Sequence, residues 1–308
     1  MVKGAVSSHF GLHRGEIMTT KTRDLLDIVW MYLLLAFLGI WVADAVEGTL
    51  IWRAGAADLA MTFMVFGFSL WKSNSSTYDA YWSVIPSYLT IWLFFVCDGA
   101  SWSWLQWGPM LVVNLWSWRL THNWARGWPG WQHEDWRYVD FREQQGKAFQ
   151  FTNFFGIHLF PTAIVFLSCV GLFEVAVSTT FEPWLLLLGL GVGLVGVAFE
   201  LIADNQLAAF RGRTNPQPED ILDTGLWGVI RYPNYLGEML FWWGVALCGL
   251  GAGGGWWMVL GAVSMMLLFV LASIPMKDKR MEYQILHIMI ERFFIQCIKK
   301  QMKLFLNQ

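Results

Sequence analysis

Long apolar segments separated by short polar ones dominate the sequence. Each is long enough, or nearly long enough, to cross a bilayer as a helix. Those before residue 204 lie at 25–45, 56–72, 79–97, 102–121, 151–175 and 184–203. A later block is too long for one helix, and its glycine-rich run predicts a break between helices at 238–250 and 256–275. The pattern therefore predicts an all-α, polytopic membrane helix bundle of about seven or eight transmembrane helices.

The composition supports a lipid environment for this bundle. Of the 308 residues, 56% are hydrophobic and only 14% are charged, and the mean hydropathy is +0.43. These values exclude a disordered chain and an ordinary soluble domain. The net charge of −2 gives no reason to expect a nucleic-acid partner. The four cysteines lie far apart without ligand-like spacing, so we expect neither a bound metal nor a disulfide framework.

The distribution of lysine and arginine predicts the orientation. With eight spans and a cytoplasmic N-terminus, 20 of the 21 Lys and Arg residues fall in cytoplasmic segments, and Arg53 is the exception. We therefore expect a multi-pass protein of the endoplasmic reticulum or a bacterial inner membrane, with both termini in the cytoplasm. The two long polar segments, 122–150 and 205–236, then share the cytoplasmic face.

The same pattern divides the chain into segments. We expect an N-terminal extension that is unstructured or a weak targeting segment, a first set of transmembrane helices, a cytoplasmic loop, a C-terminal membrane domain and a basic tail. The tail is either a solvated segment or an amphipathic helix on the membrane surface. The boundaries are 1–24, 25–121, 122–150, 151–283 and 284–308.

Charged residues align at the end of the 184–203 span. Glu200, Asp204, Leu207 and Arg211 are spaced by four, three and four residues, which places them on one face of a helix as it leaves the membrane. Because ionisable groups at membrane depth are costly unless paired or hydrated, Glu200 and Asp204 are candidate site residues. The alternative is a ladder of salt bridges that only anchors the helix end.

A second cluster follows within the segment DTGLWGVIRYPNYLGE. Pro233 favours extended geometry in the residue before it, and the chain then enters a helix that begins at Glu238. Arg231, Asn234 and Tyr235 offer a cation, an amide and a phenol near a helix start, a combination that suits a phosphate-bearing ligand. The alternative is an ordinary polar loop between membrane helices.

These blocks resemble a known family. The segments FELIADNQ (199–206), ILDTGLWGVIRYPNYLGE (221–238) and SIPMKDKR (273–280) resemble the C-terminal membrane domain of the steroid 5-alpha-reductase family, most closely its DUF1295 branch. DAYWSVIP (79–86), LWSWRLTHNWARG (115–127) and EDWRY (134–138) also resemble that branch. The resemblance covers about residues 55–283.

The resemblance implies an integral membrane reductase that binds NADPH from the cytoplasmic side. Such an enzyme delivers hydride to a carbon–carbon double bond conjugated to a carbonyl, in a lipid or steroid-like substrate. Carried over position by position, the cofactor-binding residues would be Glu200, Asp204, Arg211, Arg231, Asn234, Tyr235, Glu238 and Arg280.

The sequence also departs from the family pattern. Tyr232 stands where the family has a histidine, Asp278 stands where it has a glutamate, and an Ile- and Lys-rich tail replaces its short C-terminal stretch. Reduction of an enone requires an acid near the carbonyl oxygen, but the Gln-Glu pair of the steroid reductases is not found. Asp79, Tyr81 and Tyr88 lie at plausible depth and are the candidate catalytic residues, with a structural role as the alternative.

Two other functions stay open at this point. Isoprenylcysteine carboxyl methyltransferases and phospholipid methyltransferases share an Arg-His-Pro-x-Tyr-x-Gly turn and bind S-adenosylmethionine there. Glu238 directly after Gly237, and the Glu200–Asp204 pair, favour the reductase branch. A non-catalytic relative that keeps the fold is the third possibility. A cavity lined by Trp and Phe would suit a steroid, another enone lipid or a fatty acyl chain.

Overall fold

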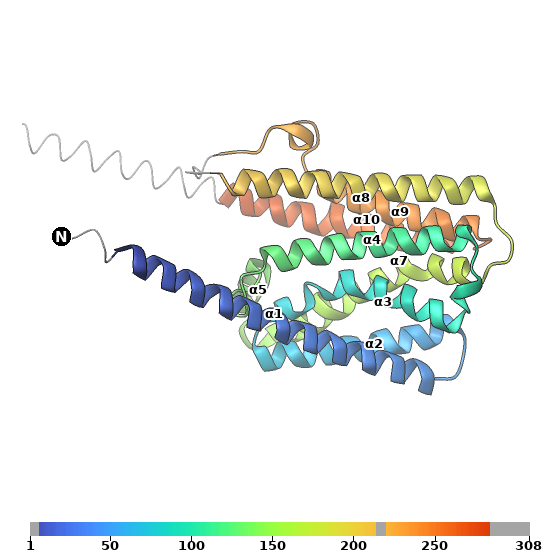
Figure 1. Cartoon of the computed structure of the whole chain (residues 1–308), viewed down its shortest axis with the longest axis horizontal. Coiled ribbons are helices and arrows are strands. Elements are labelled where there is room, and N and C mark those ends of the chain that lie inside the picture. Colours follow the sequence, from blue (N-terminus) through green and yellow to red (C-terminus); the bar gives the residue numbers. More distant parts are fainter. Residues whose placement is uncertain (1–5, 214–219, 284–308) are drawn as a thin grey trace, which may run out of the picture.

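The computed structural model describes the backbone of residues 6–213 and 220–283, and side chains from residue 20 onward. This part of the chain is helical without strands, and its long helices lie side by side in an elongated bundle (Figure 1). The α-helices are α1 (Val6–Ala45), α2 (Leu50–Lys72), α3 (Tyr81–Val96), α4 (Trp104–Gly127), α5 (Trp136–Gln145), α6 (Phe149–Phe151), α7 (Phe160–Val177), α8 (Pro183–Arg211), α9 (Pro233–Gly251) and α10 (Val259–Leu268). The 3-10 helices are η1 (Ser75–Tyr78), η2 (Gly99–Ser101), η3 (Gly146–Ala148), η5 (Gly225–Gly228) and η6 (Trp256–Met258), and the π-helices are η4 (Thr152–Leu159) and η7 (Phe269–Ser273).

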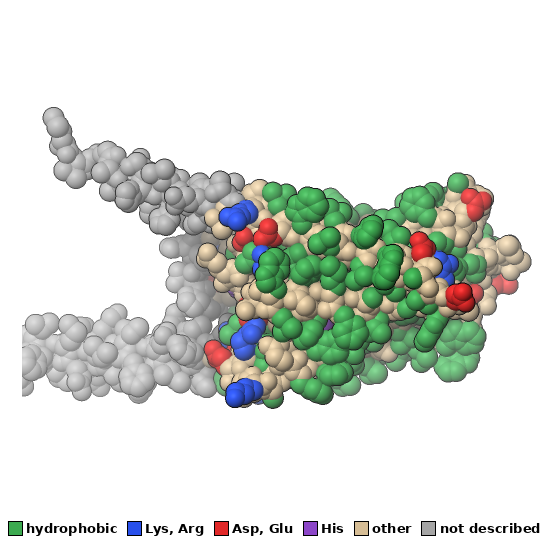
Figure 2. Space-filling model, turned by 90° about the horizontal axis from the view of Figure 1, so that it is seen from below, with side chains coloured by type: hydrophobic (Ala, Val, Ile, Leu, Met, Phe, Trp, Pro, Cys, Tyr) green, Lys and Arg blue, Asp and Glu red, His purple; other side chains and the backbone are tan. Residues whose placement is uncertain are grey.

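Several helical segments have the length and hydropathy needed to cross a membrane. Within the described residues these are Thr20–Ala45, Leu50–Lys72, Trp136–Val177, Pro183–Arg211 and Trp256–Tyr283. Helices α3, α4 and α9 run alongside them in the same bundle (Figure 1). Large apolar side chains face outward, as in Phe37 and Phe95, which are 73% and 75% exposed. Figure 2 shows a broad hydrophobic band between ends that carry the charged side chains. The predicted all-α, polytopic membrane bundle is confirmed.

The glycine-rich run divides the last apolar block as predicted. Helix α9 ends at Gly251 and η6 begins at Trp256. Between them Gly253 has φ +92°, a left-handed conformation that glycine adopts without strain. The first helix of this hairpin begins at Pro233, earlier than Glu238, because a proline at the first helical position needs no hydrogen-bond partner for its nitrogen.

Other helix ends differ from the expected ones. Helix α4 continues to Gly127, beyond the predicted limit at 121. Helix α8 continues past its apolar span, which ends at 203, to Arg211, as the alignment of Glu200 with Arg211 on one helix face predicted. The apolar pattern marks only the part of a helix in lipid, whereas Ala, Leu, Gln and Arg continue a helix beyond it. Helix α1 begins at Val6, so most of the segment expected to be an unstructured extension is helical. The predicted basic tail, 284–308, lies outside the described residues.

Helices α8 and α9 pack with their backbones in close contact. A Cβ atom added to Gly196 would lie 2.5 Å from the backbone nitrogen of Phe241, and one added to Gly244 would lie 2.5 Å from that of Gly193. Small residues at helix interfaces allow such approach in membrane proteins. On the neighbouring helix α4, Trp116 stacks on Phe241 with ring centroids 4.5 Å apart. This packing fixes how α4, α8 and α9 present their polar ends.

Candidate functional site

Three adjoining cavities lie at the end of the bundle that carries α5. We name them the outer cavity, of about 570 Å³, the neck, of about 200 Å³, and the inner cavity, of about 420 Å³. Trp136 and Lys277 line both the outer cavity and the neck, and Asp135 and Arg137 line both the neck and the inner cavity. Tyr235 lines all three, so the neck lies between the other two.

The outer cavity combines positive charge with flat apolar walls. It lies between the end of α8, the start of α9 and the helix that follows η7. Its lining includes the cations Arg211, Arg231, Lys277 and Arg280, and one carboxylate, Asp220. The apolar part of the lining consists of Trp136, Leu207, Phe210, Ile221, Leu222, Trp227 and Met281. Such a lining suits a ligand that has both anionic groups and ring systems.

The turn before α9 is held against the last helix. The Tyr232 hydroxyl donates to Asp278 Oδ1 at 2.5 Å, and Arg231 Nη2 lies 2.8 Å from the same oxygen. Burial and the Asp278 carboxylate raise the pKa of Tyr232 to about 12, so the hydroxyl stays a donor at neutral pH. Next to this turn, the buried Asn234 Oδ1 has no hydrogen-bond partner within the described residues. A buried polar atom without a partner is rare, and here it lines the outer cavity.

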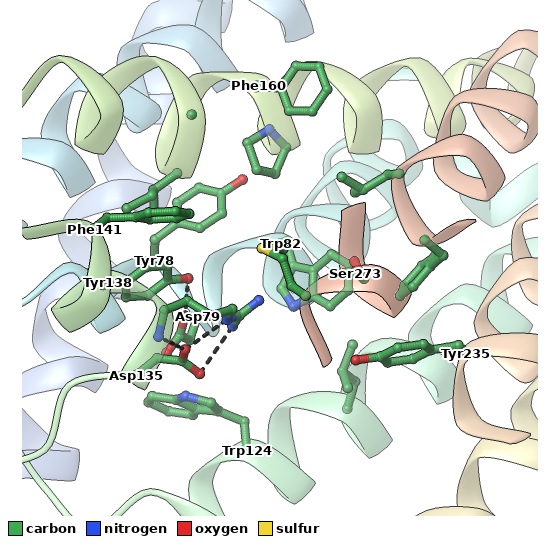
Figure 3. A pocket seen from close by; sticks show the side chains of 18 of the residues that line it. Tyr78, Asp79, Trp82, Trp124, Asp135, Tyr138, Phe141, Phe160, Tyr235 and Ser273 are labelled. Atoms are coloured by element: carbon green, nitrogen blue, oxygen red, sulfur yellow. Dashed lines mark hydrogen bonds and ion pairs between the residues drawn. The ribbon is translucent and has the colours of Figure 1, made fainter. Parts of the chain in front are cut away.

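The inner cavity is mostly aromatic. Tyr78, Trp82, Trp124, Phe141 and Phe160 surround it (Figure 3). Both π-helices contribute to its wall, η4 through Gly156 and Ile157 and η7 through Phe269 and Ser273. Because π-helical turns are rare and frequently occur at functional sites, their coincidence on one cavity marks it as a candidate substrate site.

A polar group lies on one side of the inner cavity. The Tyr138 hydroxyl donates to Asp79 Oδ1 at 2.7 Å (Figure 3). Arg137 donates to both carboxylate oxygens of Asp135, at 2.7 and 3.1 Å. Burial raises the pKa of Asp79 to about 6, even though Arg137 is near. Burial acts in the same direction on Asp135, but the hydrogen bonds and charge of Arg137 hold the pKa of that carboxyl below its usual value.

The connection between α2 and α3 positions this group. Asn74 Nδ2 donates to the backbone oxygens of Trp131 and His133, at 3.0 and 2.9 Å. The backbone nitrogen of Ser75 donates to Glu134 Oε1 at 2.7 Å, and that of Asp135 donates to Ser76 Oγ at 2.9 Å. These hydrogen bonds attach the segment before α5 to η1, and so bring Tyr138 of α5 to Asp79.

A separate group of charges is buried between α4, α8 and α9. Arg119 donates to Glu200 Oε2 through Nη2 and to Asp204 Oδ2 through Nη1, the latter at 2.7 Å. Glu238 accepts indole N–H bonds at 3.1 and 3.0 Å from Trp116 and Trp242. Arg119, Glu200 and Glu238 are each at most 5% exposed. This group lines none of the three cavities.

Comparison with known proteins places the chain in a family. The family model described as "Protein of unknown function (DUF1295)" matches residues 65–287. The chain belongs to the DUF1295 family. It is similar to the uncharacterized protein C594.04c of Schizosaccharomyces pombe, with 26% identity over 211 residues that cover 60% of this chain and 60% of that protein. No solved structure matches the chain.

Only some of the predicted cofactor-binding residues line the outer cavity. Of the residues that the sequence predicted for a cofactor, five line it, namely Arg211, Arg231, Asn234, Tyr235 and Arg280. The structure does not bring Glu200, Asp204 or Glu238 to it, because the face of α8 that carries the first two turns toward Arg119. These three carboxylates belong instead to the buried group between α4, α8 and α9.

The three candidate catalytic residues lie at different places in the structure. Asp79 lines the inner cavity, but Tyr81 and Tyr88 line none of the three cavities. Tyr81 is buried and donates to Asp58 Oδ1 at 2.7 Å, and the Tyr88 hydroxyl lies next to Gly39 of α1 without a hydrogen-bond partner in the described chain. Sequence reasoning assigned no role to Arg137 and Tyr138, or to Lys277. The only signal for the first two was their place in the DUF1295 segment EDWRY.

Two departures from the DUF1295 pattern contact each other. Tyr232, which replaces a histidine, and Asp278, which replaces a glutamate, form the 2.5 Å hydrogen bond that holds the turn. The two departures thus interact directly, and their hydrogen bond supports the turn that carries Asn234.

Proposed function

We propose that the protein is an integral membrane, NADPH-dependent oxidoreductase. It reduces a carbon–carbon double bond conjugated to a carbonyl in a lipid or steroid-like substrate. The observation that carries this proposal is the pairing of two cavities through the neck: a cationic outer cavity adjoins an aromatic inner cavity that contains an acid group. Hydride transfer requires cofactor and substrate in this kind of contact, with water kept out.

The residues present at the outer cavity fit NADPH. Arg211 and Lys277 form no ion pair within the described residues, so their charge is available to phosphate groups. Asn234 Oδ1, which is buried without a partner in the part of the chain that the structure describes, can accept a hydrogen bond from a hydroxyl or amide of the cofactor. Trp136 and Trp227 offer flat surfaces for its rings. Bound here, NADPH supplies the hydride.

The chain's own residues then have distinct tasks. The cations of the outer cavity bind phosphate, and Tyr235 forms part of the wall between cofactor and substrate. The aromatic side chains of the inner cavity exclude water from the reacting carbon atoms. Arg137, which lines the neck and the inner cavity, stabilises negative charge that develops on the carbonyl oxygen of the substrate.

The charge of the outer cavity also favours this function over methyl transfer. S-adenosylmethionine carries a sulfonium cation and no phosphate. Four cations around one cavity repel a positive ligand and attract an anionic one. The same lining supports catalytic function over a non-catalytic relative, because a purely structural protein has no need for a partly buried cation such as Lys277, which forms no ion pair within the described residues.

Ligand titration tests the proposal. Protein purified in detergent is titrated with NADPH and with S-adenosylmethionine, and binding is followed by energy transfer from tryptophan to the nicotinamide or by calorimetry. We expect binding of NADPH that weakens with salt, because phosphate contacts are electrostatic. Tighter binding of S-adenosylmethionine than of NADPH would contradict the reductase function.

Variants localise the binding. We expect Lys277→Ala and Asn234→Ala each to weaken NADPH binding about tenfold or more, because a charge-assisted or buried hydrogen bond is worth about 1.5–3 kcal/mol. Lys147→Ala is the matched control, since Lys147 is an exposed cation at the same end that lines none of the cavities. Equal affinities in all three variants and the wild type would show that the cofactor binds elsewhere.

A further inference from the structure

We infer that Tyr138 delivers the proton that the reduction requires, and that Asp79 replaces it. This inference rests on the proposed reductase function, to which it adds the acid. Both residues line the inner cavity, and a 2.7 Å hydrogen bond joins the Tyr138 hydroxyl to Asp79 Oδ1. Figure 3 shows the two side chains together on one side of the cavity, near the neck residue Asp135.

The two carboxylates of the cavity have different partners. Asp135 is bound by the Arg137 guanidinium through two hydrogen bonds, and its pKa is below the usual value, so it stays ionised. Asp79 is bound by a neutral phenol, and burial raises its pKa to about 6. When the surroundings make the pKa values of two neighbouring carboxyl groups differ in this way, the group with the higher pKa is the one that can hold and release a proton near neutral pH.

The proton transfer follows from the direction of the hydrogen bond. When Asp79 is ionised, the Tyr138 hydroxyl donates to it. When Asp79 carries a proton, its carboxyl group can donate to Tyr138 Oη, which frees the phenol O–H to turn toward a substrate oxygen. The dyad therefore presents an acid to the cavity only in its protonated state.

The reduction adds a hydride and a proton to the substrate. Hydride from NADPH forms a C–H bond at the β-carbon, and the electrons of the carbon–carbon double bond move toward the carbonyl oxygen. The O–H bond of Tyr138 breaks as a new O–H bond forms on that oxygen, and the Asp79 proton passes to the Tyr138 oxygen. The resulting enol becomes the saturated ketone, NADPH becomes NADP⁺, and water at the open end of the cavities returns a proton to Asp79.

Other tyrosines at this end lack one of the two requirements. Tyr78 lines the same cavity, but the partner of its hydroxyl, at 2.9 Å, is the hydroxyl of Thr162, which cannot store a proton at neutral pH. The Tyr81 hydroxyl is bonded to a carboxylate, Asp58, at the same 2.7 Å, but it lines no cavity. Tyr138 combines a carboxyl partner with access to the substrate.

The pH dependence of the dyad reflects all the groups that face Asp79. From the segment before α5 and from α5 itself these are Asp135, Arg137 and Tyr138. Ser76 and Tyr78 of η1 and Tyr32 of α1 also interact with Asp79. The Tyr138 hydrogen bond favours the ionised form of Asp79, so its removal raises the pKa of Asp79 further.

The first arm of the test needs no substrate. Difference infrared spectra of wild type against Asp79→Asn report the carboxyl C=O band of Asp79 as pH is varied. We expect half-protonation near pH 6 in the wild type, and a shift to higher pH in Tyr138→Phe. Titration of Asp79 near pH 4, as in an ordinary carboxyl group, would contradict the pairing of Asp79 with Tyr138. So would the same titration of Asp79 in Tyr138→Phe as in the wild type. Both results hold whatever reaction the protein performs.

The second arm measures turnover in nanodiscs with NADPH and progesterone as the enone probe. We expect Tyr138→Phe to lower kcat by about 10²–10⁴-fold with little change in KM or NADPH affinity, and Asp79→Asn to remove the loss of activity above about pH 6. Tyr81→Phe is the matched control, and we expect a less than tenfold loss. Full turnover in Tyr138→Phe would overturn the inference.

A wild-type protein that binds no NADPH would instead refute the proposed function. The infrared measurement would still show whether Asp79 and Tyr138 act as a pair.

Discussion

Arg119 compensates two buried carboxylates at once. Its guanidinium contacts Glu200 and Asp204, and its own side chain is 5% exposed. Ions removed from water are stabilised only by partners of opposite charge, and loss of one partner leaves the others uncompensated. The spacing of Glu200 and Asp204 identified this group in the sequence, but not the helix that it faces.

We expect Arg119→Met to lower the free energy of unfolding by about 3–5 kcal/mol, because it leaves two carboxylates without a cation. Equilibrium unfolding in detergent, followed by tryptophan fluorescence, measures the change. Arg142→Met is the control, since the Arg142–Glu134 pair is also 2.7 Å long but its arginine side chain is 35% exposed. There we expect about 1 kcal/mol or less. Equal effects of the two changes would contradict a structural role for Arg119.

Glycines determine how two elements, α8 and α9, meet. We expect Gly244→Ala to destabilise the protein by about 1–3 kcal/mol, because the new Cβ would lie 2.5 Å from the backbone nitrogen of Gly193 and 2.7 Å from the backbone oxygen of Gly189. A backbone atom cannot move aside as the end of a side chain can, so the helices must separate. Thermal unfolding in detergent measures the loss.

Gly191→Ala is the control for this prediction. Gly191 is on α8 but exposed, and a Cβ atom there would meet nothing within 4 Å. Alanine has the higher helix propensity, so we expect no loss and up to about 1 kcal/mol of gain. If Gly244→Ala behaved like Gly191→Ala, the close contact between α8 and α9 would not exist.

At the level of elements, hydropathy sufficed to predict the long apolar helices and the break at 249–255, but not α5, which lies in the segment 122–150 predicted as a loop. It placed the end of α4 too early, because the pattern does not record where helix propensity continues outside lipid. The site was predicted less completely. Arg231, Asn234 and Tyr235 are neighbours in one turn, whereas Asp79 and Tyr138 meet only because the α2–α3 connection binds the segment before α5. Such contacts depend on tertiary structure and have no signature in the spacing of residues.

The whole molecule is asymmetric in charge along its long axis. Residues of α5 and of the C-terminal end of α8 contribute to the lining of the outer cavity, the neck and the inner cavity. These two elements lie at the same end of the bundle (Figure 1). Arg53, the cation expected on the other side, lies near the start of α2, where it pairs with Asp44 at 3.2 Å and donates to the backbone oxygen of Ala43 at 2.7 Å. Its charge is thus locally compensated, which fits an end that tolerates few cations.

The distribution of cations predicts that the cavities open to the cytoplasm, where NADPH is available. Lys147 of η3 and Thr179, between α7 and α8, are exposed at opposite ends of the bundle. Each is replaced by cysteine in a chain whose Cys97 and Cys297 are changed to serine, and expressed in a bacterial inner membrane. We expect a membrane-impermeant maleimide to label Thr179→Cys in intact cells, and Lys147→Cys only after the membrane is opened. The reverse labelling would place the cavities outside the cell, and a cytoplasmic cofactor could then not be their ligand.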